Sequence, residues 1–273
     1  MNSLSLSAVF RRSMEATLVQ PYNNAHDSFL PPRINRSVSM QNHRRRSQST
    51  GIRSTLADNS VDVSSVARQS QTVYNDNLFD RLAINHLSHC LQASTGLRNE
   101  KRGYDGLVEA ATVAARHFSP IEQRQIIIQT LEMAIPKPIL SLIKTVLKPS
   151  KFAREYFAVF TTFFFAWLVG PCEVREAEFD GKKEKSVVHI PKCRFLEETN
   201  CVGMCTNLCK MPSQTFIKES LGMPIYMVPN FDDMSCDMKF GQEPPAQSLD
   251  PAFTQPCYKQ CKSSGRHQKN CTK

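Results

Sequence analysis

The sequence predicts an α+β fold, with a helical N-terminal half followed by a β-hairpin and a cysteine-rich layer of helix and strand. Apolar residues recur three and four apart through residues 74–170, which is helical spacing. Asp180-Gly181, the pair that a two-residue hairpin turn prefers, then stands between two extended segments. Cysteines crowd the chain after residue 190. The 273 residues have room for one or two domains, and we expect a single compact domain over residues 71–273.

The first 70 residues are predicted to be a leader that lies outside this domain. They hold nine Arg, no Lys and only four acids, which is typical of a plastid or mitochondrial transit peptide. A disordered arm and a nucleic-acid-binding arm around residues 43–47 are the alternatives, but polybasic arms usually mix Lys with Arg. The start of the chain lacks the apolar stretch of a secretory signal. We therefore expect reduced thiols unless they bind a metal.

Four helices are predicted ahead of residue 150. Residues 75–92 and 104–118 each place apolar side chains on one face. The third helix begins with Ser119 as its N-cap and Pro120 at its first position, and Glu122 completes a capping box. A short fourth helix starts at Pro138 and ends before Pro149.

The segment FAVFTTFFFAWLVG, residues 157–170, carries no charge. As a helix it would span ~21 Å, short of the ~30 Å hydrocarbon core of a bilayer, so we do not expect a transmembrane span. Such a stretch is usually a buried core helix. The alternatives are the wall of an apolar ligand site and a face that enters a membrane surface. In either case the side chains predicted to contact the apolar ligand or the membrane are Phe160, Phe163, Phe164 and Trp167.

After residue 170 the pattern changes to short extended and helical segments. We expect, in order, a hairpin over 174–190, a helix through the cysteine run, a helix that starts at 211 and ends before Gly222, and strands at 223–228 and 235–240. This hairpin and cysteine-rich part covers residues 171–262, and residues 263–273 form a basic tail.

The cysteine run CVGMCTNLCK, residues 201–210, places Cys201, Cys205 and Cys209 four residues apart. Four residues advance a helix by about 400°, so the three thiols share a face, but each step climbs ~6 Å. Two sulfurs on one tetrahedral ion lie within ~4 Å of each other. A straight helix therefore cannot bring all three to one ion. All three could serve only if the helix breaks, for which Gly203 is the candidate, or if a multi-iron cluster spans the gap.

Further thiols could complete a ligand set, because Cys257 and Cys261 repeat the four-residue spacing near the end of the chain. Buried free cysteines also pack well as small hydrophobes, and this is the alternative for each residue. We predict metal or redox use for the group and assign no catalytic residue. The predicted metal ligands are Cys193, Cys201, Cys205, Cys209 and Cys236. Gly-rich phosphate loops, GxSxG and HExxH are absent, so no common motif identifies the chemistry.

A longer stretch resembles a known family. KCRFLEETNCVGMCTNLCKMPSQTFIKESLGMPIYMVPNFDDMSCDMKFGQEPP, preceded by FFFAWLVGPCEVRE and KEKSVVHI, is similar to the plant β-carotene isomerases of strigolactone biosynthesis, the Dwarf-twenty-seven family. The resemblance runs from about Asn75 to Cys261, roughly two thirds of the chain. The family block includes all of the cysteines from Cys193 to Cys261, whereas Cys90, Cys172 and Cys271 depart from it.

The resemblance implies an iron-containing plastid enzyme that converts all-trans-β-carotene reversibly to 9-cis-β-carotene at the C9–C10 double bond. Its product would feed carotenoid cleavage dioxygenases on the way to carlactone and strigolactones, which control shoot branching. The implied partners are all-trans-β-carotene, those dioxygenases and the plastid membrane surface, from a location in the stroma and with no nucleic acid. The resemblance does not choose between mononuclear iron and an iron–sulfur cluster.

The implied reaction suits iron and thiols. β-Carotene offers no oxygen, nitrogen or acidic proton, and rotation about its C9–C10 bond requires a temporary loss of π-bond order. One-electron exchange with a metal, protonation to a delocalised cation and reversible addition of a sulfur radical could each supply that loss. Iron and thiols fit the first and third routes, and no buried acid stands out for the second. The hypothesis is a thiolate-bound iron centre beside an apolar groove. The competing interpretation is a non-catalytic iron–sulfur or zinc protein with an electron-transfer or structural role.

Overall fold

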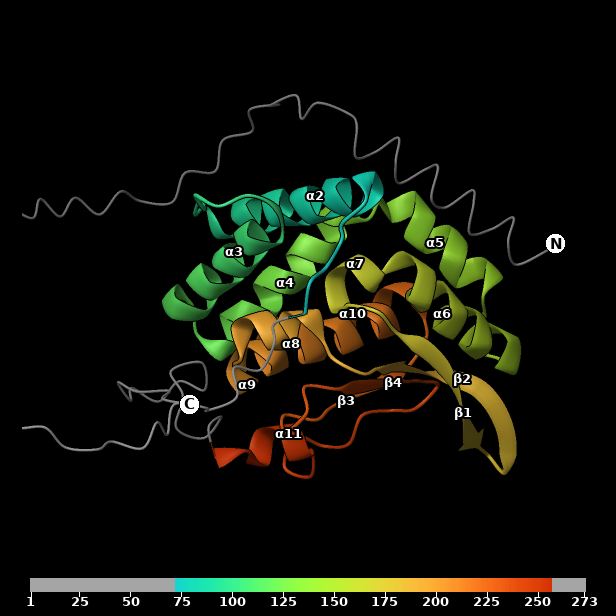
Figure 1. Ribbon diagram of the computed structural model, residues 1–273. Helices are drawn as coiled ribbons and strands as arrows, with labels where there is room; N and C mark the ends of the chain where they lie inside the picture. Colours follow the sequence, from blue (N-terminus) through green and yellow to red (C-terminus); the bar gives the residue numbers. More distant parts are fainter. Residues whose placement is uncertain (1–71, 257–273) are drawn as a thin grey trace, which may run out of the picture. The chain divides into compact units, whose positions relative to one another are not determined.

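The computed structural model describes residues 72–256 and confirms the α+β class. Helices come first and a four-stranded antiparallel sheet follows, with strand order β1-β2-β4-β3 (Figure 1). The helices are α2 Leu78–Thr95, α3 Gly103–His117, α4 Pro120–Ala134, α5 Lys137–Val146, α6 Lys151–Phe164, α7 Ala166–Val169, α8 Arg194–Thr199, α9 Val202–Met204, the π-helix η1 Cys205–Lys210, α10 Met211–Leu221 and α11 Pro251–Thr254. The strands are β1 Glu173–Phe179, β2 Lys182–Ile190, β3 Ile225–Pro229 and β4 Cys236–Phe240. The predicted leader, the basic tail, Cys257, Cys261 and Cys271 lie outside the described residues.

Local capping chemistry fixes where several helices begin. The side chain of Ser119 accepts a hydrogen bond from the backbone of Glu122 and the Glu122 carboxylate accepts one in return, so α4 starts with the predicted capping box. Asn77 and Asp80 form an equivalent box at α2, and Ser150 caps α6. The predicted apolar helix is interrupted. It ends as α6 at Phe164 and resumes as the single turn of α7.

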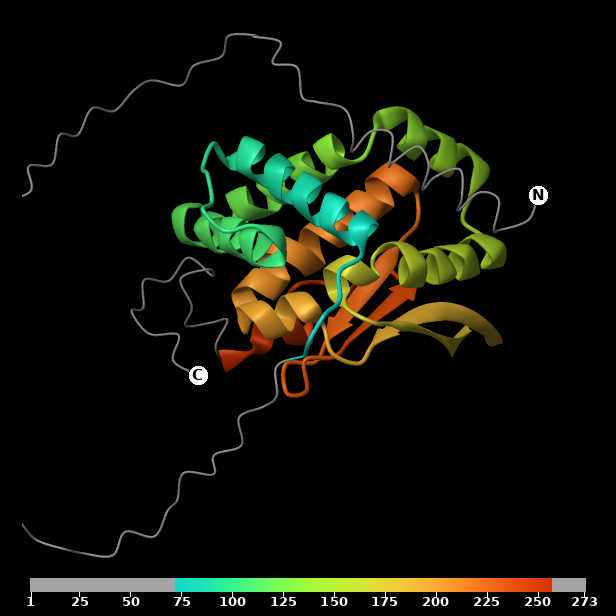
Figure 2. The same cartoon turned by 45° about the horizontal axis from the view of Figure 1, so that its top comes forward.

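The hairpin forms as its turn sequence predicts. Asp180 has φ 49° and Gly181 has φ 72°, the two positive values that a type I′ turn requires. β2 continues inward and pairs with β4, so that Ile190 lies opposite Cys236. The helix α6 covers β2, while α4 and α2 lie above α10 and η1 on the side away from the sheet (Figures 1 and 2). The cysteine run is therefore enclosed between a helical layer and the sheet.

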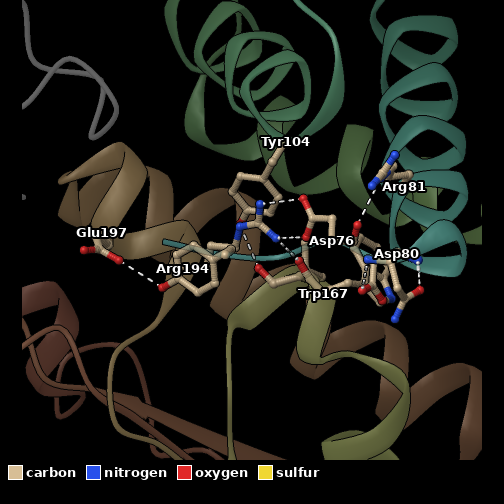
Figure 3. A network of polar contacts seen from close by, with 10 residues as sticks. Asp76, Asp80, Arg81, Tyr104, Trp167, Arg194 and Glu197 are labelled. Carbon is tan, nitrogen blue, oxygen red and sulfur yellow. Dashed lines mark hydrogen bonds and ion pairs between the residues drawn. The ribbon is translucent and has the colours of Figure 1, made fainter. Parts of the chain in front are cut away.

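A buried arginine connects the segment before α2 to α7 (Figure 3). The Arg194 guanidinium donates to both carboxylate oxygens of Asp76, at 2.6 and 2.9 Å, and to the carbonyl oxygen of Trp167 at 3.1 Å. It also lies 3.7 Å from the centroid of the Tyr104 ring and 4.5 Å from that of Tyr74. Arg194 follows Cys193 directly, so this network also fixes the position of that thiol.

Among residues 72–256, no single helix is long and apolar enough to cross a membrane. The pair Pro120–Ala134 and Lys137–Val146, bent by 89° at its junction, meets the same criteria by length and composition when taken together.

Replacing Asp76 with Ala should destabilise the fold, because it leaves the Arg194 charge buried without its carboxylate. We expect a loss of about 3 kcal/mol, the lower end of the range for a broken buried pair, since Asp76 keeps 22 % side-chain exposure. Urea unfolding followed by circular dichroism measures it. Asp232→Ala, in an exposed turn, is the matched control and should change stability by no more than about 0.5 kcal/mol. Equal losses in both variants would contradict the role of Arg194.

Candidate functional site

An apolar cavity of about 220 Å³ lies between α5, α6, α10 and the sheet. Leu, Ile, Val, Met and Phe side chains make up most of its wall, and within residues 72–256 no Asp, Glu, Lys, Arg or His lines it. The lining residues that carry a hydroxyl or thiol are Tyr156, Thr161, Ser213 and Cys209. A cavity of this composition suits a hydrocarbon, because a polar ligand would lose its hydration without gaining partners.

The four aromatic side chains predicted to bind substrate do not share one wall. Phe160 lines the apolar cavity. Phe163 points away from it and is 78 % exposed. Phe164 is buried in the core, stacked on Phe160 with ring centroids 5.0 Å apart, and Trp167 is buried beside the Arg194 network. Their spacing of three and four residues indicated one helical face, but α6 ends at Phe164, and Phe165 separates it from α7, which contains Trp167.

Most of the cavity wall could not be predicted from the sequence. It comes from α5, α10, β3 and β4, including Ile143, Phe216, Met227 and Met238. Each of these residues has the pattern of ordinary core in its own segment, and only the tertiary arrangement brings them around one space. The amphipathic pattern of α5 was the one available signal, because a short helix with an apolar face needs a neighbour to cover it.

The cysteine run adopts a π-helix instead of the straight α-helix considered above. Cys201 is the extended N-cap of α9, and η1 runs from Cys205 to Lys210. The break lies at these residues, and Gly203 sits inside α9. Single turns of π-helix occur frequently at functional sites.

Two polar contacts hold the π-helix. Arg124 of α4 donates to the side-chain oxygen of Asn207 at 3.2 and 3.3 Å. The Lys210 ammonium pairs with Asp250 at 2.5 Å, and both side chains are at most 3 % exposed. These contacts tie the π-helix to α4 and to the residue before α11.

Four of the five predicted metal ligands come together. Cys193, Cys205, Cys209 and Cys236, hereafter the thiol cluster, line a second cavity of about 10 Å³. They come from the loop after β2, from η1 and from the first residue of β4. The Cys193 amide donates to the Met234 carbonyl at 2.7 Å, which ties the loop to the strand connection. Cys201 is not among the lining residues of this cavity.

Cys193, Cys205 and Cys236 are buried and Cys209 is partly buried, which favours the protonated form of each thiol. Burial raises the pKa of Cys209 to about 12, raises the pKa of Cys193, and raises the pKa values of Cys205 and Cys236 well above the ordinary thiol value. The neighbouring thiols add to the effect on Cys205, Cys209 and Cys236, because a second negative charge nearby would be repelled. A protonated buried thiol is a poor nucleophile, and a metal would have to displace its proton.

The thiol cluster matches an iron site in its donors but not in its arrangement. Soft sulfur donors suit iron. Within residues 72–256, however, no three His, Cys, Asp or Glu side chains are placed to hold one metal ion. The space enclosed, about 10 Å³, is at the lower limit for even one water molecule. As arranged, the cluster is not a preformed iron site.

The two cavities meet at Cys209. This residue lines both of them, together with Val169 and Met227. Among the cysteines that the structure describes, Cys209 is the one in the wall of the apolar cavity. A ligand in that cavity would contact the thiol cluster through Cys209.

Comparison with known proteins identifies the family. The family model described as beta-carotene isomerase D27-like, C-terminal, matches residues 167–248. The beta-carotene isomerase D27, chloroplastic, of Medicago truncatula is 58 % identical over 247 residues, which cover 90 % of this chain and 97 % of the relative. The protein of the same name from Arabidopsis thaliana is 56 % identical over 191 residues, 69 % of this chain and 72 % of the relative. The chain belongs to the β-carotene isomerase D27 family. No solved structure matches it.

The family assignment confirms the resemblance found in the sequence. The region matched by the D27-like model contains the whole thiol cluster. It excludes α5 and α6, which form the other wall of the apolar cavity. In this member of the β-carotene isomerase D27 family, the cavity therefore joins the matched region to the helices that precede it.

Replacing Lys210 with Met should destabilise the protein by about 3–5 kcal/mol, because Asp250 is then buried without its cation. Chemical unfolding measures the loss. Lys218→Met is the matched control, since Lys218 pairs with Glu243 at the surface with both side chains more than half exposed. That variant should lose no more than about 1 kcal/mol. Similar losses of unfolding free energy in the two variants would show that the buried ion pair of Lys210 stabilises the fold no more than the surface pair of Lys218.

Proposed function

We propose that the chain is a carotenoid cis–trans isomerase of the chloroplast, which interconverts all-trans-β-carotene and 9-cis-β-carotene by rotation about the C9–C10 bond. The names of both relatives support the substrate and the location, and agree with the expectation of an enzyme that acts on a carotenoid. The proposed place in metabolism is an early step of strigolactone biosynthesis, ahead of carotenoid cleavage dioxygenases that would take up the 9-cis product.

The observation that carries the proposal is an apolar cavity whose wall includes a thiol from a cluster of four. β-Carotene is a hydrocarbon, so recognition depends on shape and on the absence of unpaired polar groups. The cavity volume, about 220 Å³, is below the roughly 300–1,000 Å³ of pockets that enclose drug-sized ligands. It would therefore hold one end of the carotene. In β-carotene only the C7–C8 double bond separates an end ring from C9–C10, so an end-on pose still brings the reacting bond inside.

The lining residues bear on the choice among the three routes. Protonation to a delocalised cation lacks a donor, because no carboxylic acid or imidazole of the described residues is among them. One-electron exchange and reversible sulfur addition both direct attention to Cys209, the cysteine that a carotene in the cavity would contact. A turnover of ~1 per second requires a barrier of about 17 kcal/mol. We assign Cys209 as the residue closest to the isomerising bond.

Iron dependence is part of the proposal, and the thiol cluster is its assigned location. Sulfur donors suit iron, but the four thiols would have to move to share it, since no three donors in the described region are placed for one ion. Iron loading should then be accompanied by proton release from thiols whose pKa burial has raised. The proposal leaves a mononuclear ion and an iron–sulfur cluster as alternatives, and derives no reaction step from either.

The competing function is a non-catalytic plastid protein that uses the same cysteines for electron transfer or structure. Anaerobic purification of the mature chain, followed by metal and sulfide analysis and incubation with all-trans-β-carotene, separates the two. The isomerase forms the 9-cis isomer, and the electron carrier shows a reversible redox signal without carotene turnover. A structural zinc protein contains zinc and is redox-silent.

The comparison of Cys209→Ser with Cys201→Ser tests the assigned residue. We expect Cys209→Ser to lower turnover by roughly 100-fold, which corresponds to about 2.7 kcal/mol of barrier. Cys201→Ser should stay within about threefold, because Cys201 lies outside both cavities. Chromatographic separation of the carotene isomers gives the rates, and metal analysis of both variants shows whether a loss follows iron content. Full activity in Cys209→Ser would remove this residue from the mechanism.

Filling the cavity should lower turnover without unfolding the chain. Ser213 lines the cavity from α10, so Ser213→Trp places an indole ring where the carotene end would sit. We expect at least a tenfold loss in kcat/KM, or about 1.4 kcal/mol, with little change in thermal stability. Ser220→Trp, on the same helix but not among the lining residues, is the matched control. Equal activity of the two variants would place the substrate elsewhere.

A further inference from the structure

We propose that α5 and the first turn of α6 form a docking surface for an anionic lipid membrane, which presents the mouth of the apolar cavity to the lipid. The docking surface consists of three apolar side chains, Leu142, Val146 and Phe152, with Lys137, Lys148 and Lys151 beside them. The proposal rests on the proposed function for its purpose, but the docking itself is measurable without turnover.

Large apolar side chains are concentrated at this place. Leu142 is 57 % exposed, Val146 53 % and Phe152 59 %. Leu142 and Val146 lie on α5, and Phe152 lies at the start of α6, directly after residues 147–151. Two more exposed apolar residues, Val159 and Phe163, continue along α6. Single exposed apolar residues are ordinary, but a group of them on one amphipathic helix is typical of an interaction surface.

The positive charge of the neighbouring residues favours an anionic membrane as the partner. Between Glu132 and Glu155 the chain carries five basic residues and no acid. Arg154 pairs with Glu184 at 2.7 Å, and Lys144 donates to the Glu219 carbonyl oxygen of α10 at 2.7 Å. The other three lysines, Lys137, Lys148 and Lys151, are exposed, and Lys151 lies 3.8 Å from Glu155. A basic amphipathic helix with exposed Leu, Val and Phe is the pattern of helices that lie in the headgroup region of anionic bilayers. A second copy of this chain would bring like charges together.

The docking surface is continuous with the cavity. Leu142 and Val146 are more than half exposed and also line the cavity, so they stand at its mouth. A row of rings leads inward along α6: Phe152 lies 6.2 Å from Tyr156, Tyr156 lies 6.1 Å from Phe160, and Phe160 lies 5.0 Å from Phe164, between ring centroids. The exposed end of this row is at the docking surface and its buried end is in the core.

The position of α5 leaves it accessible. It packs on α10 at the margin of the helical layer (Figure 2), after the 89° bend that separates it from α4. A helix in the interfacial plane buries its apolar face by ~5–10 Å. Carotene already dissolves in lipid, so its transfer to an apolar cavity gains almost no hydrophobic free energy. Extraction then depends on bringing the mouth of the cavity to the place where the substrate is.

The test is sedimentation of the mature chain with vesicles of phosphatidylcholine alone and of phosphatidylcholine mixed with phosphatidylglycerol. Wild type should bind the mixed vesicles and not the neutral ones. The double variant Lys137→Glu/Lys148→Glu should lower the partition coefficient at least 30-fold, because each lysine near an anionic surface contributes about a factor of five. Phe152→Ser should lower it roughly tenfold through loss of buried apolar area.

The matched control is Arg98→Glu/Lys101→Glu, which makes the same charge change at exposed positions between α2 and α3, away from the docking surface. It should bind mixed vesicles within a factor of about three of wild type. An equal loss in this control would mean general attraction of a basic protein, and would overturn the docking surface. So would unchanged binding of the α5 variants, or a wild-type chain that binds no vesicle. Concentration-dependent dimerisation removed by Phe152→Ser would instead assign the surface to a second copy and overturn the proposal.

Activity distinguishes this inference from the proposed function. With carotene supplied in detergent micelles, the α5 lysine variants and Phe152→Ser should turn over like wild type, because these residues are not among those that line the cavity. With carotene supplied in mixed vesicles, they should be slower by the factor found in sedimentation. Absence of isomerisation in micelles by wild type would refute the proposed function, while the vesicle binding would still stand or fall on its own.

Discussion

The arrangement of the candidate site depends on a buried ion pair. Lys210 ends the π-helix with its ammonium group fully buried, 2.5 Å from Asp250 and 4.8 Å from the centroid of the Tyr226 ring. A lone buried charge would be expelled, so the two side chains must stay together. Because Asp250 belongs to the segment before α11, the pair ties the cysteine run to the last described part of the fold. The pair therefore fixes the last residue of the π-helix, next to Cys209, which lines both cavities.

A second buried charge, that of Arg194, fixes the position of Cys193 in the thiol cluster. Arg194 is bound to Asp76 and to the carbonyl of Trp167, and its predecessor in the chain is Cys193. The contacts of the thiols themselves are weak, since a thiol is a weak donor and acceptor: Cys193 accepts from the backbone of Phe195 and Leu196, and Cys236 contacts the Asp237 carbonyl oxygen at 3.9 Å. The positions of two of the thiols depend instead on the charged residues that follow them in the sequence. Lys210 follows Cys209, and Arg194 follows Cys193.

The range of each interaction decides whether the sequence could predict it. The Asp180-Gly181 turn and the Ser119 capping box depend on residues within three positions, and both form as expected. The π-helix does not, because a cysteine every four residues is equally compatible with an α-helix, and the deciding contacts come from Arg124 and Asp250 far away in the sequence. The apolar cavity is harder still to predict from the sequence, because each of its lining residues has the pattern of an ordinary core residue and only the tertiary fold leaves a space between them. Cys193 and Cys236 were grouped with the run by residue type alone, and the pairing of β2 with β4 brings them together.

The limited volume of the cavity has a consequence for the proposed reaction. A carotene whose one end fills about 220 Å³ keeps its other end outside, in the lipid if the chain is docked there. Both ends of β-carotene are chemically equivalent, yet only the inserted end reaches Cys209 during one visit. One binding event then changes one double bond, so the first product is a mono-cis isomer, and a second change requires release and insertion of the opposite end. Selectivity for a single cis bond would thus arise from the depth of the cavity and needs no group that distinguishes the two halves of the substrate.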